Sequence, residues 1–250
     1  MKVFHGDLDN TLIYSCRHEI GEEKVCVELY EGREASFMTK RSLSLLKEVQ
    51  KKALFVPVTT RTAEQYRRIN FLTHAPDYAL VCNGGILLQA GEEVAEWYEE
   101  SLRLTEESRR ELLRAEGFME QDTDRMMEVR NIRRLFLFTK SSRPMETAAR
   151  LKEVLDARLV KIFTNGKKVY ALPEGLDKGT AVRRFRDYIK TDYMLAAGDS
   201  EFDIPMLAAA DRAYAPKDLM GRCSFDVHVS GIAGKGVFSD VFLERVLADI

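Results

Sequence analysis

The sequence has little cysteine, and its cysteines are far apart. Its 250 residues include four, namely Cys16, Cys26, Cys82 and Cys223, and no two of them form a CxxC pair. The four histidines likewise show no HxxxH or HExxH spacing. Zinc sites and disulfide frameworks need closely patterned ligands or cysteines, so we expect neither. A reducing compartment, the cytoplasm, fits this cysteine usage best.

The sequence also lacks a long apolar run and a surplus of charge of either sign. No stretch of roughly 18 apolar residues occurs, and the first residues, MKVFHGDLDNT, reach carboxylates before an apolar signal core could form. Thirty-eight Lys and Arg face 40 Asp and Glu, which leaves a formal charge of −2. General nucleic-acid binding needs a basic surplus. We therefore expect a soluble cytoplasmic protein that binds neither a membrane nor a nucleic acid.

Short apolar segments that alternate with helical ones dominate the rest of the chain. Strands are predicted over 3–5, 54–58, 78–82, 193–197, 213–215 and 227–229, and helices begin after Thr39 and at Asp177. A hairpin is predicted over 25–38, where apolar positions alternate around Glu31-Gly32. The alternation of short apolar strands with helices indicates an α/β fold on a doubly wound parallel sheet.

The stretch from residue 86 to residue 170 has a different pattern. It contains a predicted hairpin of 86–88 with 94–97, a charged helix from about residue 105, a strand over 135–139, a further helix and a hairpin turning at Asn165-Gly166. Because the strand–helix alternation resumes after it, this stretch reads as an inserted α+β domain. Residues 1–85 and 171–250 then form the core.

Four polar clusters stand where predicted strands end or helices begin. They are Asp7 with Asp9, the threonines Thr59 and Thr60, Lys178, and Asp199 with Asp203. Ligands of doubly wound sheets bind beyond the carboxyl ends of the strands, so we expect these side chains to meet there. Crowded carboxylates repel one another unless a cation lies between them, and oxygen ligands suit Mg²⁺. Such a site could attack phosphorus, move a proton and hold phosphoryl oxygens.

The clusters resemble, in order, the four motifs of the haloacid dehalogenase superfamily of phosphohydrolases. The matching segments are DLDNT at 7–11, VTTR at 58–61, LDKG at 176–179 and GDSEFD at 198–203. The Asn83-Gly84-Gly85 turn is similar to a feature of subfamily IIB, which includes the Cof-type hydrolases and the sucrose-phosphate and trehalose-phosphate phosphatases. In that branch an α+β cap of type 2B, which sets substrate specificity, is inserted between the second and third motifs, as residues 86–170 are here.

The resemblance implies a role for each matching residue. Asp7 would be the nucleophile and a metal ligand, and Asp9 the acid and base, with its backbone carbonyl on the metal. Phosphate would be held by Thr59, Thr60 and Lys178, and the Mg²⁺ site would be completed by Asp199 and Asp203. The implied activity is Mg²⁺-dependent hydrolysis of a phosphomonoester through an aspartyl-phosphate intermediate. A sugar phosphate or a similar small phosphorylated metabolite is the implied substrate.

Two positions depart from the family pattern. Thr60 replaces the usual glycine of the second motif, and Phe202 replaces the asparagine that commonly precedes the last aspartate of the fourth. Two alternatives stay open, and the departures at Thr60 and Phe202 motivate only the second of them. A phosphosugar mutase would use the same Asp7 chemistry and need a bisphosphate activator. A non-catalytic protein would keep the pocket and bind a phosphorylated ligand without turnover.

Overall fold

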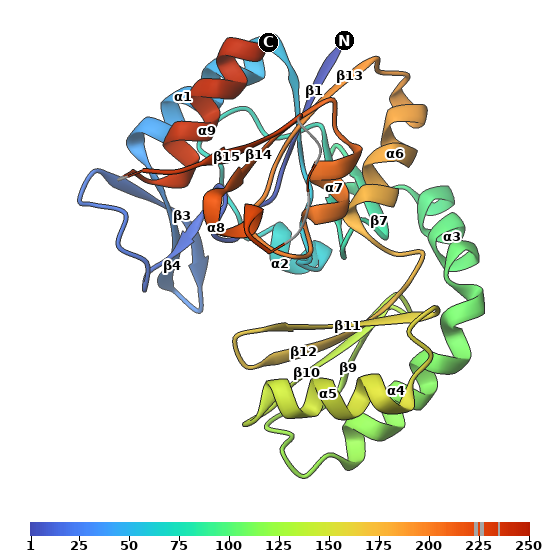
Figure 1. Cartoon of the computed structure of the whole chain (residues 1–250). Coiled ribbons are helices and arrows are strands. Elements are labelled where there is room, and N and C mark those ends of the chain that lie inside the picture. Colours follow the sequence, from blue (N-terminus) through green and yellow to red (C-terminus); the bar gives the residue numbers. More distant parts are fainter. Residues whose placement is uncertain (223–224, 226–227, 235) are drawn as a thin grey trace. The chain divides into compact units, whose positions relative to one another are not determined.

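The computed structural model describes residues 1–222, 225, 228–234 and 236–250, and the chain forms two compact units. The first unit contains Met1–Val94 and Lys178–Ile250, and the second contains Ala95–Asp177 (Figure 1). Among the described residues, no helix is long and apolar enough to cross a membrane. Cys16 and Cys26 carry free thiols, whereas Cys223 and Val227, which opens the last predicted strand, lie outside the described residues.

A five-stranded sheet forms the centre of the first unit. Its order is β15-β14-β13-β1-β5, and every neighbouring pair is parallel. The strands span Lys2–Gly6 (β1), Leu54–Pro57 (β5), Tyr193–Ala197 (β13), Arg212–Pro216 (β14) and Val229–Ile232 (β15). Because β1 lies between β13 and β5, the loops after these three strands open at the same edge. The predicted parallel sheet is confirmed.

Helices cover both faces of this sheet, as the prediction of a doubly wound fold requires. Figure 1 shows α1 (Lys40–Lys52) and α9 (Phe238–Asp249) on one face and α6 (Lys178–Ile189) and α7 (Ile204–Ala209) on the other. The start of α1 follows from local chemistry, since the Thr39 hydroxyl accepts a hydrogen bond from the Ser42 amide at 2.8 Å and caps the helix. Two four-residue helices, Ala63–Tyr66 (α2) and Lys217–Met220 (α8), complete the unit.

Side chains along β1 alternate between the two helical layers. Phe4 packs against Phe242 of α9, with ring centroids 6.0 Å apart. The next residue, His5, meets Phe185 of α6 edge-on, with centroids 5.7 Å apart. Both residues are fully buried. This period of two is typical of a strand buried on both faces, and it places Asp7 on the side of α6.

Two small antiparallel sheets flank the main sheet. One joins the predicted hairpin to a short strand, with Tyr14–Ser15 (β2), Lys24–Tyr30 (β3) and Arg33–Thr39 (β4) in the order β2-β4-β3. The other contains Tyr78–Val81 (β6), Ile86–Gln89 (β7) and Glu92–Glu93 (β8). A parallel bridge between Val58 and Leu80 connects β6 to the end of β5. The hairpin predicted over residues 25–38 is confirmed by β3 and β4.

The second unit is an α+β domain built on one antiparallel sheet. Its order is β11-β12-β10-β9, with Arg130–Ile132 (β9), Phe136–Lys140 (β10), Val160–Asn165 (β11) and Lys168–Pro173 (β12). Its helices are Ala95–Leu104 (α3), Glu106–Ser108 (a short 3₁₀ helix), Arg109–Gln121 (α4) and Pro144–Val154 (α5). Buried side chains of α4 and α5, including Leu112, Met119 and Leu151, form one apolar core with Leu137, Ile162 and Val169 of the sheet.

The second unit begins and ends later than the expected insertion at 86–170. The segment Ile86–Gln89 belongs to the first unit, because β7 pairs along its length with β6. The strand predicted over 94–97 is wrong, since α3 begins at Ala95. At the other end, β12 continues to Pro173 within the sheet of the second unit.

Candidate functional site

Neighbouring strands bring three carboxylates together at one edge of the main sheet. Asp7 directly follows β1, and its amide donates to the carbonyl of Ala197, the last residue of β13, at 2.9 Å. Asp199 and Asp203 lie in the loop after β13. One carboxylate oxygen from each of Asp7, Asp199 and Asp203 lies within 4.8 Å of the other two. The sheet order therefore explains why residues almost 200 positions apart share one site.

Lys178 lies among these carboxylates at the start of α6. Its side chain is 1% exposed, and its Nζ donates to Asp7 Oδ1 and to Asp203 Oδ1, each at 2.5 Å. Burial opposes the charge on Lys178, but the charges of Asp203 and Asp7 outweigh it and raise the pKa of Lys178. The site therefore holds one permanent buried cation facing three acidic groups.

The acidic groups are not neutralised by one lysine. Burial, followed by the charge of Asp203, raises the pKa of Asp7 well above its ordinary value, although Lys178 opposes this. Burial and the charge of Asp203 also raise the pKa of Asp199 to about 6, even though the Thr11 hydroxyl donates to Asp199 Oδ1 at 2.8 Å. A divalent cation would relieve this repulsion, and carboxylate oxygens are the donors that hard cations prefer. The donor set thus fits a metal such as Mg²⁺.

Two glycines permit the close packing of the loops around Asp203. A Cβ on Gly198 would lie 2.4 Å from the Cβ of Asp203, and a Cβ on Gly179 would lie 2.4 Å from the carbonyl oxygen of Pro205. Both contacts are closer than a side chain allows. Asp203 Oδ2 accepts hydrogen bonds from the amides of Asp199 and Ser200 at 3.0 and 2.9 Å, and this fixes its carboxylate beside Lys178.

The remaining predicted site residues lie in the loops after β1 and β5. Thr59 is buried, its amide donates to Leu80 O at 2.9 Å, and its Oγ1 accepts from the Arg61 amide at 3.1 Å. Thr60 is half-buried next to it. Asp9 is half-exposed and pairs with Arg61 through two hydrogen bonds, from Nε to Oδ2 at 2.8 Å and from Nη2 to Oδ1 at 2.7 Å. The structure thus groups Asp7, Lys178, Asp199 and Asp203 directly, and it places both threonines in the loop after β5, the strand beside β1.

Comparison with known proteins identifies the family. A family model of haloacid dehalogenase-like hydrolases matches residues 92–218, slightly more than half of the chain, including Lys178, Asp199 and Asp203. The chain belongs to this family. It is a hydrolase, and the recognition based on its four motifs is confirmed. A curated phosphoglycolate phosphatase from Methanopyrus kandleri is 26% identical over 216 residues, which cover 84% of this chain and 90% of the relative.

Solved structures of this family share the fold of the whole chain. The sucrose-phosphatase of Synechocystis sp. PCC6803, solved with sucrose and phosphate, has a TM-score of 0.66 at 13% identity and covers 98% of this chain and 97% of its own. A haloalkanoate-superfamily phosphatase from Bacteroides thetaiotaomicron has a TM-score of 0.58 at 16% identity and covers 100% and 96%. The predicted fold class, a doubly wound core with an additional α+β domain, is confirmed.

Three residues of the site have contacts that the sequence analysis did not anticipate. Thr11 and Arg61 stand inside the first and second motifs, so their motif positions were the available signal. Glu28 was predicted only as part of a hairpin strand, yet it is buried and paired with Arg61. Phe202, one of the two departures from the family pattern, is a buried residue with 7% exposure.

His5, two residues before Asp7, should make the stability of the folded protein depend on pH. Its ring is fully buried, and neither ring nitrogen has a hydrogen-bond partner within the part of the chain that the structure describes. Burial lowers its pKa from 6.5 to about 3. In the unfolded chain His5 therefore becomes protonated below pH 6.5, whereas in the folded protein it stays neutral until about pH 3. Stability contributed by neutral His5 is complete above pH 6.5 and falls as the pH drops through this window.

We expect His5→Phe to remove this contribution to the pH dependence. Between pH 6.5 and pH 4.5 the free energy of unfolding of the wild type should fall by about 2–3 kcal/mol more than that of the variant, at about 1.4 kcal/mol per pH unit. Urea denaturation at several pH values measures the difference. His74→Phe, at a ring that is 77% exposed, is the matched control and should follow the wild type. Parallel pH profiles for wild type and His5→Phe would show that His5 titrates normally in the folded state.

Proposed function

We propose that the protein is a Mg²⁺-dependent phosphomonoester hydrolase with Asp7 as its nucleophile. The observation that carries this proposal is the buried Lys178, which contacts the Asp7 carboxylate at 2.5 Å beside two further acidic groups. An isolated structural ion pair would not need the third carboxylate. Membership of the hydrolase family and the phosphatase names of the relatives support the same chemistry. The proposed substrate is a sugar phosphate or another small phosphorylated metabolite.

The metal would be held by Asp7, Asp199 and Asp203 together with the backbone carbonyl of Asp9. The raised pKa values of Asp7 and Asp199 support this assignment, because a cation is the missing partner of buried carboxylates that repel one another. When bound, Mg²⁺ supplies positive charge that neutralises phosphoryl oxygens. Oxygen donors and a phosphate ligand are the environment that Mg²⁺ prefers in proteins.

The chain's own residues account for both halves of the reaction. The Asp7 carboxylate attacks phosphorus, and the bond from phosphorus to the ester oxygen breaks as Asp9 gives that oxygen a proton. Asp9 then takes a proton from a water molecule, which attacks the aspartyl phosphate, releases inorganic phosphate and restores Asp7. Lys178, Thr59 and Thr60 would hold the phosphoryl oxygens through these steps. The second unit, Ala95–Asp177, is proposed as the cap that selects the alcohol part of the substrate.

Phosphate release from a substrate panel tests the proposal. Purified protein is assayed with sugar phosphates, phosphoglycolate, nucleotides and an aryl phosphate, in Mg²⁺ and in chelator. Release that requires Mg²⁺ is the expected result, and the preferred ester would name the substrate class. Absence of release from every ester would reject hydrolysis. Activity that appears only with an added sugar bisphosphate would instead indicate a phosphosugar mutase.

Asp199 provides a prediction specific to the metal. Because Asp199 is assigned as a ligand and not as a reacting group, Asp199→Asn should raise the Mg²⁺ concentration for half-maximal activity by at least about 10- to 100-fold. A Mg²⁺ titration of phosphate release measures this change. Glu201→Gln, an exposed carboxylate two residues further on, is the control and should leave the titration unchanged. An unaltered Mg²⁺ requirement in Asp199→Asn would remove Asp199 from the metal site.

A further inference from the structure

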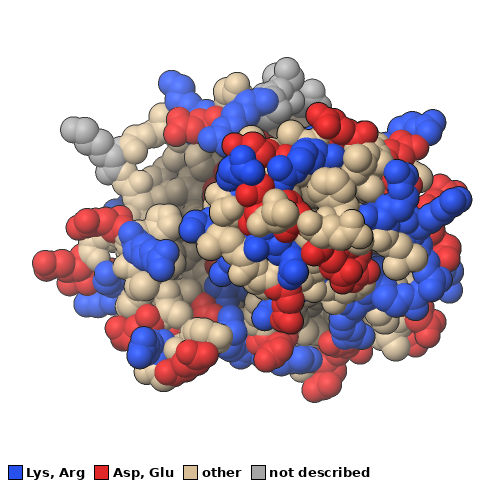
Figure 2. Space-filling view, turned by 90° about the horizontal axis from the view of Figure 1, so that it is seen from below, with Lys and Arg blue, Asp and Glu red and all other residues tan. Residues whose placement is uncertain are grey.

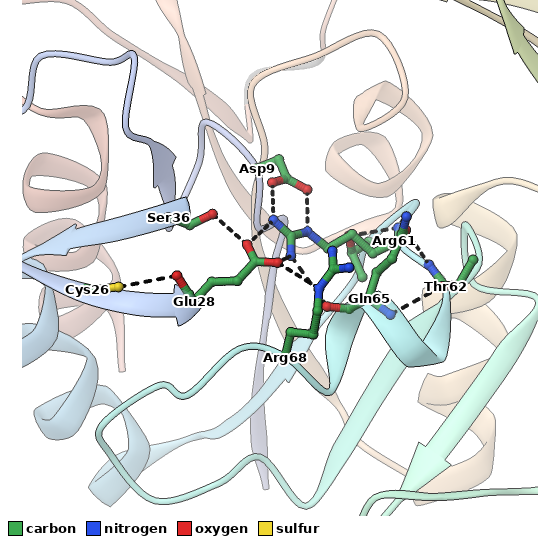
Figure 3. A network of polar contacts seen from close by, with 9 residues as sticks. Asp9, Cys26, Glu28, Ser36, Arg61, Thr62, Gln65 and Arg68 are labelled. Atoms are coloured by element: carbon green, nitrogen blue, oxygen red, sulfur yellow. Dashed lines mark hydrogen bonds and ion pairs between the residues drawn. The ribbon is translucent and has the colours of Figure 1, made fainter. Parts of the chain in front are cut away.

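Arg61 is held between two carboxylates that come from different parts of the chain. On one side its guanidinium makes the paired hydrogen bonds to Asp9. On the other side its Nη1 and Nη2 lie 2.9 and 3.0 Å from the two carboxylate oxygens of Glu28 (Figure 3). The Arg61 side chain is 12% exposed and that of Glu28 is 3% exposed. Paired, planar contacts of this kind fix orientation as well as charge.

Glu28 reaches Arg61 because β3 is irregular at this residue. Cys26 pairs with Phe37 and Glu28 pairs with Ser36, so two steps along β3 correspond to one step along β4. This bulge buries Val27 and Glu28 in succession, although alternate residues of a strand normally point to opposite faces. Bulges of this type re-aim side chains next to functional sites. The bulge in the hairpin therefore turns the Glu28 carboxylate inward, where Arg61 binds it.

Further contacts hold Glu28 itself in a single orientation. The Ser36 hydroxyl donates to Glu28 Oε2 at 2.6 Å, and Arg68 Nε donates to Glu28 Oε1 at 3.1 Å. Burial opposes ionisation of Glu28, but the hydrogen bonds from Arg61 and Ser36 outweigh it and lower the pKa of Glu28. Both oxygens of Glu28 are thus engaged, and the carboxylate is fixed before any substrate arrives.

The Asp9 carboxyl group depends on Arg61 for a fixed orientation, because about half of its side chain is exposed to solvent. Its side chain is 49% exposed, and its pairing with Arg61 is what orients the carboxylate. An arginine fixed on one side by a buried carboxylate transmits that rigidity to the residue on its other side. Figure 3 shows the three side chains in this order, Glu28, Arg61 and Asp9.

We propose that Glu28 is a positioning residue for proton transfer: by holding Arg61 from the hairpin side, it fixes the orientation of the Asp9 carboxyl group, which in its protonated form gives a proton to the leaving oxygen of the substrate. The proposal rests on the proposed function, in which Asp9 protonates the departing alcohol. In this role Glu28 acts through Arg61 and not directly on the substrate or the metal. Its effect should therefore depend on how much the leaving group needs a proton.

Two esters with different leaving groups test the proposal in Glu28→Gln. An alkoxide such as that of glycerol phosphate needs protonation to leave, whereas nitrophenolate from p-nitrophenyl phosphate leaves almost without help. The ratio kcat/KM reports the steps up to departure of the leaving group. General acid catalysis contributes about 100- to 10,000-fold, so partial misplacement of the acid should lower kcat/KM for glycerol phosphate by about 10- to 100-fold. For p-nitrophenyl phosphate we expect a change below about 3-fold.

Glu34→Gln is the matched control. Glu34 is an exposed glutamate on β4 of the same hairpin, so this variant removes the same charge without touching Arg61. It should leave both values of kcat/KM at the wild-type level. A purely structural role of Glu28 would reduce the amount of active protein and so lower kcat/KM equally for both esters. Such an equal loss would overturn the proposal, as would an unchanged kcat/KM for both esters.

A second variant covers the case in which Glu28→Gln does not fold. Arg61→Lys keeps the positive charge but loses the paired contact with Asp9, and it should show the same selective loss for glycerol phosphate. The urea midpoint verifies that Arg61→Lys is folded. An equal loss of kcat/KM for both esters in the folded variant would reject the positioning role. Wild-type protein that hydrolyses neither ester in Mg²⁺ would instead overturn the proposed function, and the role of Glu28 with it.

Discussion

Replacing Asp7 with asparagine is expected to lower phosphate release by at least about 1,000-fold, since loss of a nucleophile that acts within a catalytic unit has effects of this size or larger. A carboxamide is a poor nucleophile and cannot form the aspartyl phosphate. The fold should survive, because asparagine keeps the shape of the side chain and Lys178 retains its contact with Asp203 at 2.5 Å. Phosphate release under Mg²⁺ saturation and the urea midpoint measure the two effects separately.

An exposed aspartate in the same unit provides the control for this variant. Asp187→Asn lies on α6, outside the site, and should match the wild type in both measurements. Activity within 10-fold of wild type in Asp7→Asn, in protein free of deamidated material, would eliminate covalent catalysis by Asp7.

The second large effect is expected at Lys178, for stability as well as activity. Lys178→Met removes a buried ammonium that faces three acidic side chains. Breaking a buried ion pair from one side typically costs about 3–5 kcal/mol. Loss of a positive contact to the phosphoryl oxygens should also lower turnover by about 100- to 1,000-fold. Urea denaturation and phosphate release measure these changes.

Addition of Mg²⁺ should show whether Lys178→Met loses stability through electrostatic repulsion or through altered packing. A cation that binds the native carboxylates stabilises the folded protein, so the variant should regain part of its lost stability as Mg²⁺ rises. Lys190→Met, at an exposed lysine just after α6, should be as stable as wild type. A Lys178→Met protein of wild-type stability in chelator would contradict the buried charge cluster.

The elements that carry the catalytic core were predictable because local signals agree with the tertiary structure. Short apolar runs at 3–5, 54–58 and 193–197 form strands of the parallel sheet, and Thr39 caps α1 as its side chain favours. Once the sheet is parallel, the polar residues after its strands share one edge. Asp7 and Asp199 come after the neighbouring strands β1 and β13, so their closeness follows from that topology.

Other features depend on contacts that no short pattern reveals. Residues 94–97 are predicted as a strand, but β7 already has β6 and the short β8 as partners, and the chain turns helical at Ala95. The burial of Glu28 depends on a bulge and on Arg61, which lies 33 residues away in the sequence. A glutamate in a hairpin strand would normally face solvent, so its inward orientation appears only in three dimensions.

The charge distribution over the surface agrees with the balance seen in the sequence. Lys and Arg are interspersed with Asp and Glu on the face drawn in Figure 2. This mixing on one face agrees with the net formal charge of −2. The proposed recognition of a phosphorylated substrate would then depend on local groups such as the buried Lys178.

Capture of the phosphoryl group on Asp7 tests the central claim most directly. Asp9→Asn is mixed with p-nitrophenyl phosphate and Mg²⁺ and quenched in acid, because this ester leaves without a proton while the variant lacks the base that activates water. The account predicts a burst of nitrophenol equal to the amount of protein and a phosphoryl group that peptide mapping places on Asp7. Nitrophenol and phosphate released together from the first turnover, or a phosphoryl group on another residue, would contradict it.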